Sequence, residues 1–117
     1  MELKRVVVTG LGAITPIGKN LPEFWENLVN GVSGADYIKK FDANKFKTTF
    51  ACEVKDFNSD QYFERKESKR LDLYAQFALI AADEAIKDAN LDLEKINHNK
   101  AGVIWGSGIG GIDTLTQ

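Results

Sequence analysis

Two glycine-rich runs contain the residue type from which phosphate-binding turns are built, but only one of them has the required spacing. A dinucleotide-binding turn has the pattern G-x-G-x-x-G, in which the third glycine lets a helix begin close to the pyrophosphate. The first run contains Gly10 and Gly12, but Thr15 replaces the third glycine and Pro16 follows it. The run at 106–111 matches the pattern literally. Because a glycine-rich strand exit is more often a tight bend, a structural turn is the preferred interpretation of both runs, and nucleotide binding at 106–111 is the alternative.

Nucleophilic or metal-binding chemistry has few candidate residues. Cys52 and His98 are the single cysteine and the single histidine, so no intrachain disulfide can form and a zinc site would need mostly carboxylate ligands. A reactive thiolate is stabilised by a helix N-terminus or a nearby imidazolium, and the sequence around Cys52 indicates neither. We therefore expect Cys52 to be a partly buried strand residue, His98 to be an exposed loop residue, and no metal to bind.

The basic segment, residues 64–70, concentrates positive charge. It contains four cations and two carboxylates, a local net charge of +2, on a chain whose formal net charge is −2. The ordinary interpretation is a solvated helix start. Cations at a helix N-terminus oppose the helix macrodipole, however, so a docking site for an acidic partner is the alternative. The overall charge gives no reason to expect a nucleic acid or an anionic membrane as the main partner.

Two apolar runs predict the strands that position these residues. Residues 3–9 include three consecutive valines, and residues 101–105 read Ala-Gly-Val-Ile-Trp. Continuous apolar runs are typical of strands that are covered on both faces of a sheet. The order strand, helix, irregular excursion, helix, strand favours parallel pairing between the two runs. Within the excursion, a short edge strand is predicted at 48–54.

Three helical segments are predicted between the apolar runs. Asn20 can cap the first helix, with Glu23 three residues later, and Gly31 ends it in a left-handed conformation. A short helical turn is expected over 59–64. The clearest helix covers 68–90, where apolar residues recur with a 3.6-residue period. Its stripe consists of Tyr74, Phe77, Ala78, Ala81, Ala85 and Ala89. Because alanine side chains are small, we expect a neighbouring helix or sheet to approach this stripe closely.

Length and composition indicate part of one globular domain. The chain has 117 residues, of which 44% are hydrophobic and 27% are charged, and this balance is not that of a disordered chain. A buried parallel strand needs neighbours at both edges, which two strands cannot provide. We therefore expect residues 1–117 to be an incomplete part of a larger domain. No apolar run reaches the roughly 18 residues of a membrane span and no signal peptide is recognised, so a cytoplasmic location is expected.

Six motifs, in order and with matching spacing, resemble the N-terminal part of a β-ketoacyl-acyl-carrier-protein synthase. They are Arg5–Gly12 with Thr15–Gly18, Phe41-Asp42, Val54–Phe57, Arg65–Glu67, Leu71-Asp72 and Gly106–Gly111. The resemblance is strongest to the type II condensing enzyme of bacterial fatty-acid synthesis, and it extends over residues 1–117. It implies an α/β, thiolase-like fold, of which this chain is the start of the first of two similar βαβαβ-type halves.

The resemblance implies a reaction whose catalytic residues lie outside this chain. Enzymes of this family join an acyl thioester to malonyl-acyl-carrier protein by decarboxylative Claisen condensation, with no cofactor. A cysteine at a helix N-terminus and two histidines perform that chemistry. Cys52 is followed by Glu53 rather than by the family's serine or threonine, and His98 matches neither histidine. No catalytic residue is therefore assigned here, and the chain alone is expected to be inactive.

Two functional features of the family do map onto this chain. Lys66, Lys69 and Arg70 resemble the surface that receives the acidic helix of acyl carrier protein. Ile109 resembles the isoleucine that lines the acyl pocket near the dimer interface, which also implies a homodimer. Trp105, just before that loop, is larger than the small or aliphatic residue that the resemblance implies.

Three other functions remain open on the sequence alone. Within the same fold, the protein could be a polyketide-type ketosynthase or a chain-length factor. From other classes, it could be a small nucleotide-binding module that uses 106–111, or a non-enzymatic fragment that binds acyl carrier protein.

Overall fold

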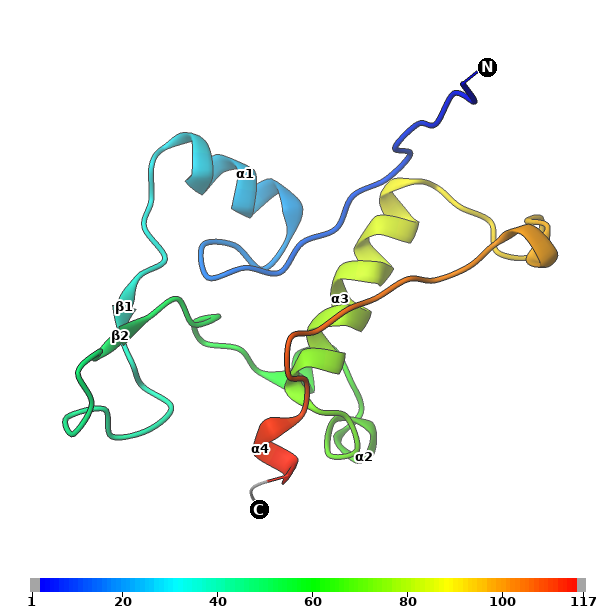
Figure 1. Cartoon of the computed structure of the whole chain (residues 1–117). Helices are drawn as coiled ribbons and strands as arrows, with labels where there is room; N and C mark the ends of the chain where they lie inside the picture. Colours follow the sequence, from blue (N-terminus) through cyan, green and yellow to red (C-terminus); the bar gives the residue numbers. More distant parts are fainter. Residues whose placement is uncertain (1–2, 116–117) are drawn as a thin grey trace.

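The computed structural model describes residues 3–115 and consists of helices joined by long extended or irregular segments (Figure 1). In chain order, the elements are α1 (Leu21–Val29), β1 (Asp36–Tyr37), β2 (Phe50–Ala51), η1 (Ser59–Gln61), α2 (Arg65–Ser68), α3 (Leu73–Asp88), η2 (His98–Lys100) and α4 (Ile112–Leu115). The 16-residue helix α3 is the longest of these elements. None of the helices within residues 3–115 has both the length and the apolar character needed to cross a membrane.

Helix α1 forms where the sequence predicts it. The Asn20 side chain accepts a hydrogen bond from the Glu23 backbone N–H at 2.9 Å, and the Glu23 carboxylate accepts one from the Lys19 N–H at 2.9 Å. This reciprocal arrangement satisfies N–H groups at the start of the helix, where the backbone ladder offers no acceptor. Gly31 follows the C-cap residue Asn30 with a φ of +69° and ends the helix as expected.

Helix α3 begins later than the sequence predicts. Its first residue is Leu73 rather than Ser68, because the preceding residues form the separate helix α2 and the Asp72 backbone is extended, with a ψ of 153°. At the other end, α3 stops at Asp88, two residues before the predicted end, and Asn90 adopts a left-handed φ of 48° after the helix. Helix η1 confirms part of the helical turn predicted over 59–64.

The predicted parallel pairing of 3–9 with 101–105 is absent from the structure. Both segments belong to no strand within the described part of the chain. Their apolar side chains face solvent: Val6 is 89% exposed, Val103 is 91% exposed and Ile104 is fully exposed. A segment becomes a strand only when its N–H and C=O groups have hydrogen-bonding neighbours, and the described residues place none beside these two runs.

The sheet that the described residues form is small and antiparallel. Strands β1 and β2 pair in a register that places Asp36 opposite Ala51. Strand β2 confirms a strand within the predicted segment 48–54. Cys52 lies just after this strand and is exposed, so the expectation of a partly buried strand cysteine is wrong.

The N-terminal glycine run packs on the alanine stripe of α3. A Cβ atom added to Gly10 would lie 2.7 Å from the Ala89 Cβ, and one added to Gly12 would lie 2.8 Å from the Ala85 backbone nitrogen and against the Ala81 carbonyl oxygen. Side chains larger than hydrogen would therefore not fit at either position. The alanines are approached closely, as expected, but by a loop segment rather than by a helix or sheet. The contact also explains both glycines by packing.

Few residues are buried. Where burial is described, the buried residues are Gly18, Ala43 and Gln76. Many large apolar side chains are exposed instead, including those of the two extended runs. A broad exposed apolar surface is typical of an interface that another polypeptide segment covers, which agrees with the expectation of a partial domain.

Candidate functional site

The basic segment (64–70) is exposed and lies largely on α2. Its four cations, Arg65, Lys66, Lys69 and Arg70, are all exposed. No ion pair within the described part of the chain involves any of them. Their charge is therefore open to solvent and to a partner.

The basic segment does not lie at the start of the long helix, as the sequence predicted. The sequence placed the cations at the N-terminus of the long helix, where they would oppose its macrodipole. The long helix begins only at Leu73, and Lys69 and Arg70 lie instead at the C-terminal end of α2, where positive charge is favourable. The exposure and the clustering of the four cations are the features that support a docking site.

A buried side chain, Gln76 on α3, holds the basic segment in place. The Gln76 Nε2 donates hydrogen bonds to the carbonyl oxygens of Ser68 at 3.0 Å and Leu71 at 2.9 Å. The Gln76 Oε1 accepts a hydrogen bond from the Ser59 hydroxyl at 2.6 Å. This one amide therefore joins α2, the turn that follows it and η1 to the first turns of α3.

The sequence reasoning missed Gln76, although a signal was present. Gln76 is three residues after Leu73 and four before Ile80, so it shares one helix face with apolar side chains. A long polar residue on such a face is expected to need buried hydrogen-bond partners. Its exposure is only 5%.

The second glycine run, 106–111, is an open loop that is held at one end. The Ile109 side chain is 74% exposed. A Cβ added to Gly106 or Gly108 would have no neighbouring atom within 4 Å. Gly110 has a left-handed φ of +74°, and a Cβ added there would lie 3.5 Å from the Tyr74 ring. The structure thus places Ile109 on a loop whose C-terminal end rests on the start of α3.

Asp72 makes a second link between this loop and α3. Its carboxylate accepts a hydrogen bond from the Thr114 hydroxyl and lies against Gly111. This contact explains why Asp72, the N-cap residue of α3, does not cap the helix with its own side chain. It also places a negative charge at the third glycine of the G-x-G-x-x-G pattern, where a pyrophosphate would need positive or neutral surroundings. The contact disfavours nucleotide binding at this loop.

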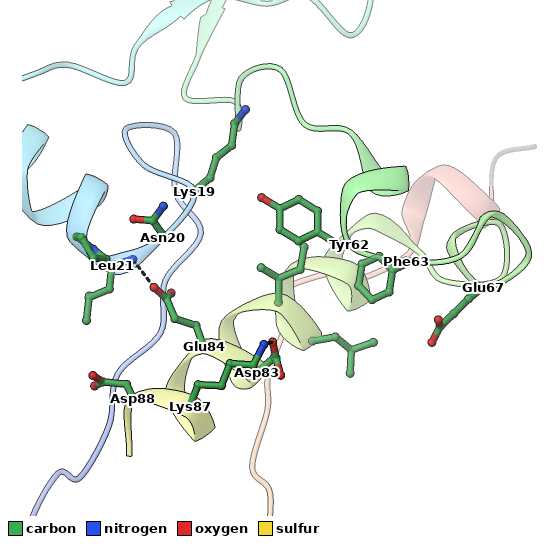
Figure 2. A pocket seen from close by; sticks show the side chains of 13 residues that line it. Lys19, Asn20, Leu21, Tyr62, Phe63, Glu67, Asp83, Glu84, Lys87 and Asp88 are labelled. Atoms are coloured by element: carbon green, nitrogen blue, oxygen red, sulfur yellow. Dashed lines mark hydrogen bonds and ion pairs between the residues drawn. The ribbon is translucent and has the colours of Figure 1, made fainter. Parts of the chain in front are cut away.

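A groove of about 790 Å³ separates α3 from the start of α1 and the segment after η1 (Figure 2). Both charged and apolar side chains line it. The lining residues are Lys19, Asn20, Leu21, Pro22, Tyr62, Phe63, Glu67, Leu79, Ile80, Asp83, Glu84, Lys87 and Asp88. Ile109, Cys52 and His98 are not among them.

The carboxylates at one end of the groove have structural partners. Glu84 accepts hydrogen bonds from the backbone N–H groups of Leu21 at 2.7 Å and Ala13 at 2.8 Å, and the first of these is drawn in Figure 2. Asp88 accepts one from the Leu11 N–H at 2.9 Å. Both oxygens of Glu84 are thus engaged in fixing the N-terminal run and α1 to α3.

Cys52 and His98 are not brought together with any other candidate residue. Cys52 follows β2 and His98 begins η2, and both are exposed. The exposed position predicted for His98 is confirmed. Within residues 3–115, no three His, Cys, Asp or Glu side chains are grouped closely enough to hold a metal ion.

Among the carboxyl groups that the structure describes, the two with shifted pKa values lie in surface ion pairs. The pKa of Asp36 is lowered because the Tyr37 N–H donates to its carboxylate, with Lys39 and Lys55 nearby. The pKa of Asp92 is lowered chiefly by its hydrogen bond with Lys95. Neither group lines the groove or lies in the basic segment, so these shifts mark surface pairs rather than a reactive site.

Comparison with known proteins identifies relatives over nearly the whole chain. Residues 3–117 match the family described as beta-ketoacyl synthase, N-terminal domain. The 3-oxoacyl-(acyl-carrier-protein) synthase 2 of Synechocystis sp. is 48% identical over 115 residues, which is 98% of this chain and 28% of the relative. The Staphylococcus aureus protein of the same name is 44% identical over 112 residues, 96% of this chain and 27% of the relative. This chain therefore spans just over a quarter of the length of these relatives.

Two solved ketosynthase structures have a similar backbone. The ishigamide ketosynthase/chain length factor matches with a TM-score of 0.68 and 34% identity, over 78% of this chain and 23% of that chain. A type II polyketide ketosynthase in complex with its acyl-carrier protein matches with a TM-score of 0.57 over the same shares, and at 21% identity it supports the fold alone. These findings confirm the predicted family and its thiolase-like fold: the chain belongs to the beta-ketoacyl synthase family and corresponds to its N-terminal domain.

Proposed function

We propose that this chain is the N-terminal part of a synthase that joins an acyl thioester to malonyl-acyl-carrier protein by decarboxylative Claisen condensation. Within that enzyme, the chain binds the acyl carrier protein and forms part of the acyl-pocket wall. The observation that carries this proposal is the exposed cluster of Lys66, Lys69 and Arg70, which has no ion-pair partner among the described residues of a ketosynthase-family chain.

The chemistry of this surface suits an acidic protein partner. Several like charges on one turn create a local positive potential on a chain of net charge −2, which attracts and orients an acidic partner over a long range. The names of the relatives support the identity of this partner, because those proteins are synthases that act on acyl-carrier-protein substrates. Acyl- and malonyl-loaded carrier proteins are therefore the proposed partners of the basic segment.

The proposed role of Ile109 is to line the acyl pocket once other parts of the enzyme cover the 106–111 loop. An isoleucine that is 74% exposed in these residues is well suited to be covered by an apolar partner segment. Because the family pocket lies near a dimer interface, we also propose a homodimer. The catalytic cysteine and histidines would come from outside residues 1–117. A reducing, cytoplasmic location is also proposed, and it fits residues 1–117, among which Cys52 has no second cysteine for a disulfide.

A chimeric synthase tests the docking proposal. Residues 3–117 would replace the matching segment of the Synechocystis synthase, and Lys66, Lys69 and Arg70 would be changed together to Glu. We expect the KM for malonyl-carrier protein to rise about tenfold or more, because repulsion replaces attraction at the docking surface. The kcat and KM for pantetheine thioesters, which lack the carrier protein, should change less than about twofold.

A matched triple variant controls for net charge. Lys40, Lys45 and Lys47 are exposed and lie in a different part of the chain, and changing all three to Glu alters the total charge equally. This control should leave the KM for malonyl-carrier protein unchanged. Equal effects of the two triple variants, or an inactive parent chimera, would contradict the proposed function.

A polyketide-type ketosynthase or chain-length factor is the second candidate. The 34% identity to the ishigamide ketosynthase/chain length factor supports it. The higher identity of 48% to a 3-oxoacyl-(acyl-carrier-protein) synthase 2 favours the first proposal.

A further inference from the structure

We infer that Gln76 is a positioning residue for carrier recognition: it acts through the two backbone carbonyls that bracket Lys69 and Arg70. This inference rests on the proposed function of the basic segment. It adds a residue that is buried beneath the charged surface rather than part of it.

The hydrogen bonds of Gln76 have a defined geometry around the two cations. The acceptor carbonyls belong to Ser68, immediately before Lys69, and to Leu71, immediately after Arg70. Both ends of the two-residue stretch that carries the charges are therefore tied to the same amide group. A rotation or shift of this stretch would break at least one of these bonds.

The surroundings of Gln76 make these bonds costly to lose. Its side chain is only 5% exposed, so water cannot readily replace a missing partner. Its two amide N–H donors are both used on the carbonyls, and its oxygen accepts from Ser59. Helix α2 has only four residues and is far too short to hold its own conformation. The orientation of the basic segment therefore depends on its attachment to α3.

Two substitutions remove the donors of Gln76 in different ways. Gln76→Met keeps a similar length without any polar group, and Gln76→Glu keeps the acceptor for Ser59 but has no donor for the carbonyls. In the chimeric synthase, we expect each to raise the KM for malonyl-carrier protein about five- to tenfold, as expected for the loss of buried hydrogen bonds. Turnover of pantetheine thioesters should change less than about twofold, because no carrier protein binds in that reaction.

Ser59→Ala is the matched control on the same network. It removes only the hydroxyl that donates to Gln76 and leaves both carbonyl bonds intact. Segment 57–62 also keeps the contact of the Phe57 ring with Phe77, whose centroids are 5.0 Å apart, so η1 stays in place. The KM for malonyl-carrier protein should therefore stay within about twofold of the parent value.

A double-mutant cycle distinguishes positioning from general destabilisation. Gln76→Met is combined with the triple Glu variant of Lys66, Lys69 and Arg70. If Gln76 acts by positioning these cations, the substitution has no further effect on the KM for malonyl-carrier protein in that background. A purely structural role predicts an equal fold-change in both backgrounds and a parallel loss on pantetheine thioesters.

The outcomes separate this inference from the proposed function. If the triple variant raises the KM for the carrier substrate but neither Gln76 variant does, the positioning role is wrong and the docking surface stands. If the triple variant has no effect, both the docking surface and the role of Gln76 are contradicted. A Gln76 variant that loses both activities equally also overturns the inference.

Discussion

The two glycine-rich runs of this chain look alike in sequence, but their surroundings differ. Gly10 and Gly12 lie so close to α3 that an added Cβ would overlap its backbone or side chains, whereas an added Cβ at Gly106 or Gly108 would meet no atom within 4 Å. Similar glycine spacing thus has two different causes. In the first run, the backbone must approach a helix. In the second run, Tyr74 and Asp72 contact the C-terminal end of the loop, and the rest of the loop is exposed, so that another segment can pack on it.

The largest expected effect comes from filling the tight contact of the first run. Gly12→Val would press a side chain against the Ala81 carbonyl and the Ala85 nitrogen, and backbone atoms cannot move away easily. We expect the free energy of unfolding to fall by about 3 kcal/mol, in the upper range for overpacking. Urea unfolding of the 117-residue chain, followed by the fluorescence of its two tryptophans, would measure this change.

Gly102→Val is the matched control for this substitution. Gly102 lies in the second extended run and has no neighbouring atom within 4 Å of an added Cβ position. The same valine should therefore cost less than about 0.5 kcal/mol there. Similar losses at both positions would contradict the contrast between the two runs.

A smaller effect is expected from the carboxylate that holds the first run in place. Glu84→Gln leaves one acceptor for the two backbone N–H groups of Ala13 and Leu21, and it turns an amide donor toward the other. We expect the free energy of unfolding to fall by about 2 kcal/mol, because hydrogen bonds to a charged group are strong and Glu84 is half-buried.

The neighbouring carboxylate provides the comparison for Glu84. Asp83 is exposed and pairs only with Lys87, at 2.6 Å, so Asp83→Asn should cost less than about 0.5 kcal/mol. If the two variants are equally stable, Glu84 does not fasten the N-terminal run.

The sequence predicted those elements whose causes are local. The cap at Asn20, the left-handed Gly31 and the alanine stripe depend on neighbouring residues or on helix periodicity, and all three are confirmed. The prediction of paired strands at 3–9 and 101–105 is wrong, because pairing requires neighbouring strands that the described residues do not provide. A strand prediction from apolar runs is therefore conditional on the rest of the sheet.

The candidate site was predictable to a similar degree. The charges at Lys66, Lys69 and Arg70 and the position of Ile109 were found from the motifs, and their proposed roles remain predictions. Gln76 and Asp72 were missed as connecting residues, because their partners are 5 to 42 residues distant in sequence and are brought together only by the fold. Helix periodicity can show that Gln76 lies on an apolar face, but it does not identify the groups that Gln76 or Asp72 binds.

The smallest expected effects concern the second glycine run and test how the loop is held. Gly108→Ala meets no neighbouring atom, so the free energy of unfolding should change by less than about 0.5 kcal/mol. Gly110→Ala should cost about 1 kcal/mol, because Gly110 has a left-handed φ of +74° that alanine adopts only with strain. Urea unfolding of both variants measures the difference. Equal stabilities would mean that Gly110 is not held in this left-handed conformation, and Ile109 would then lack a defined position from which to line a pocket.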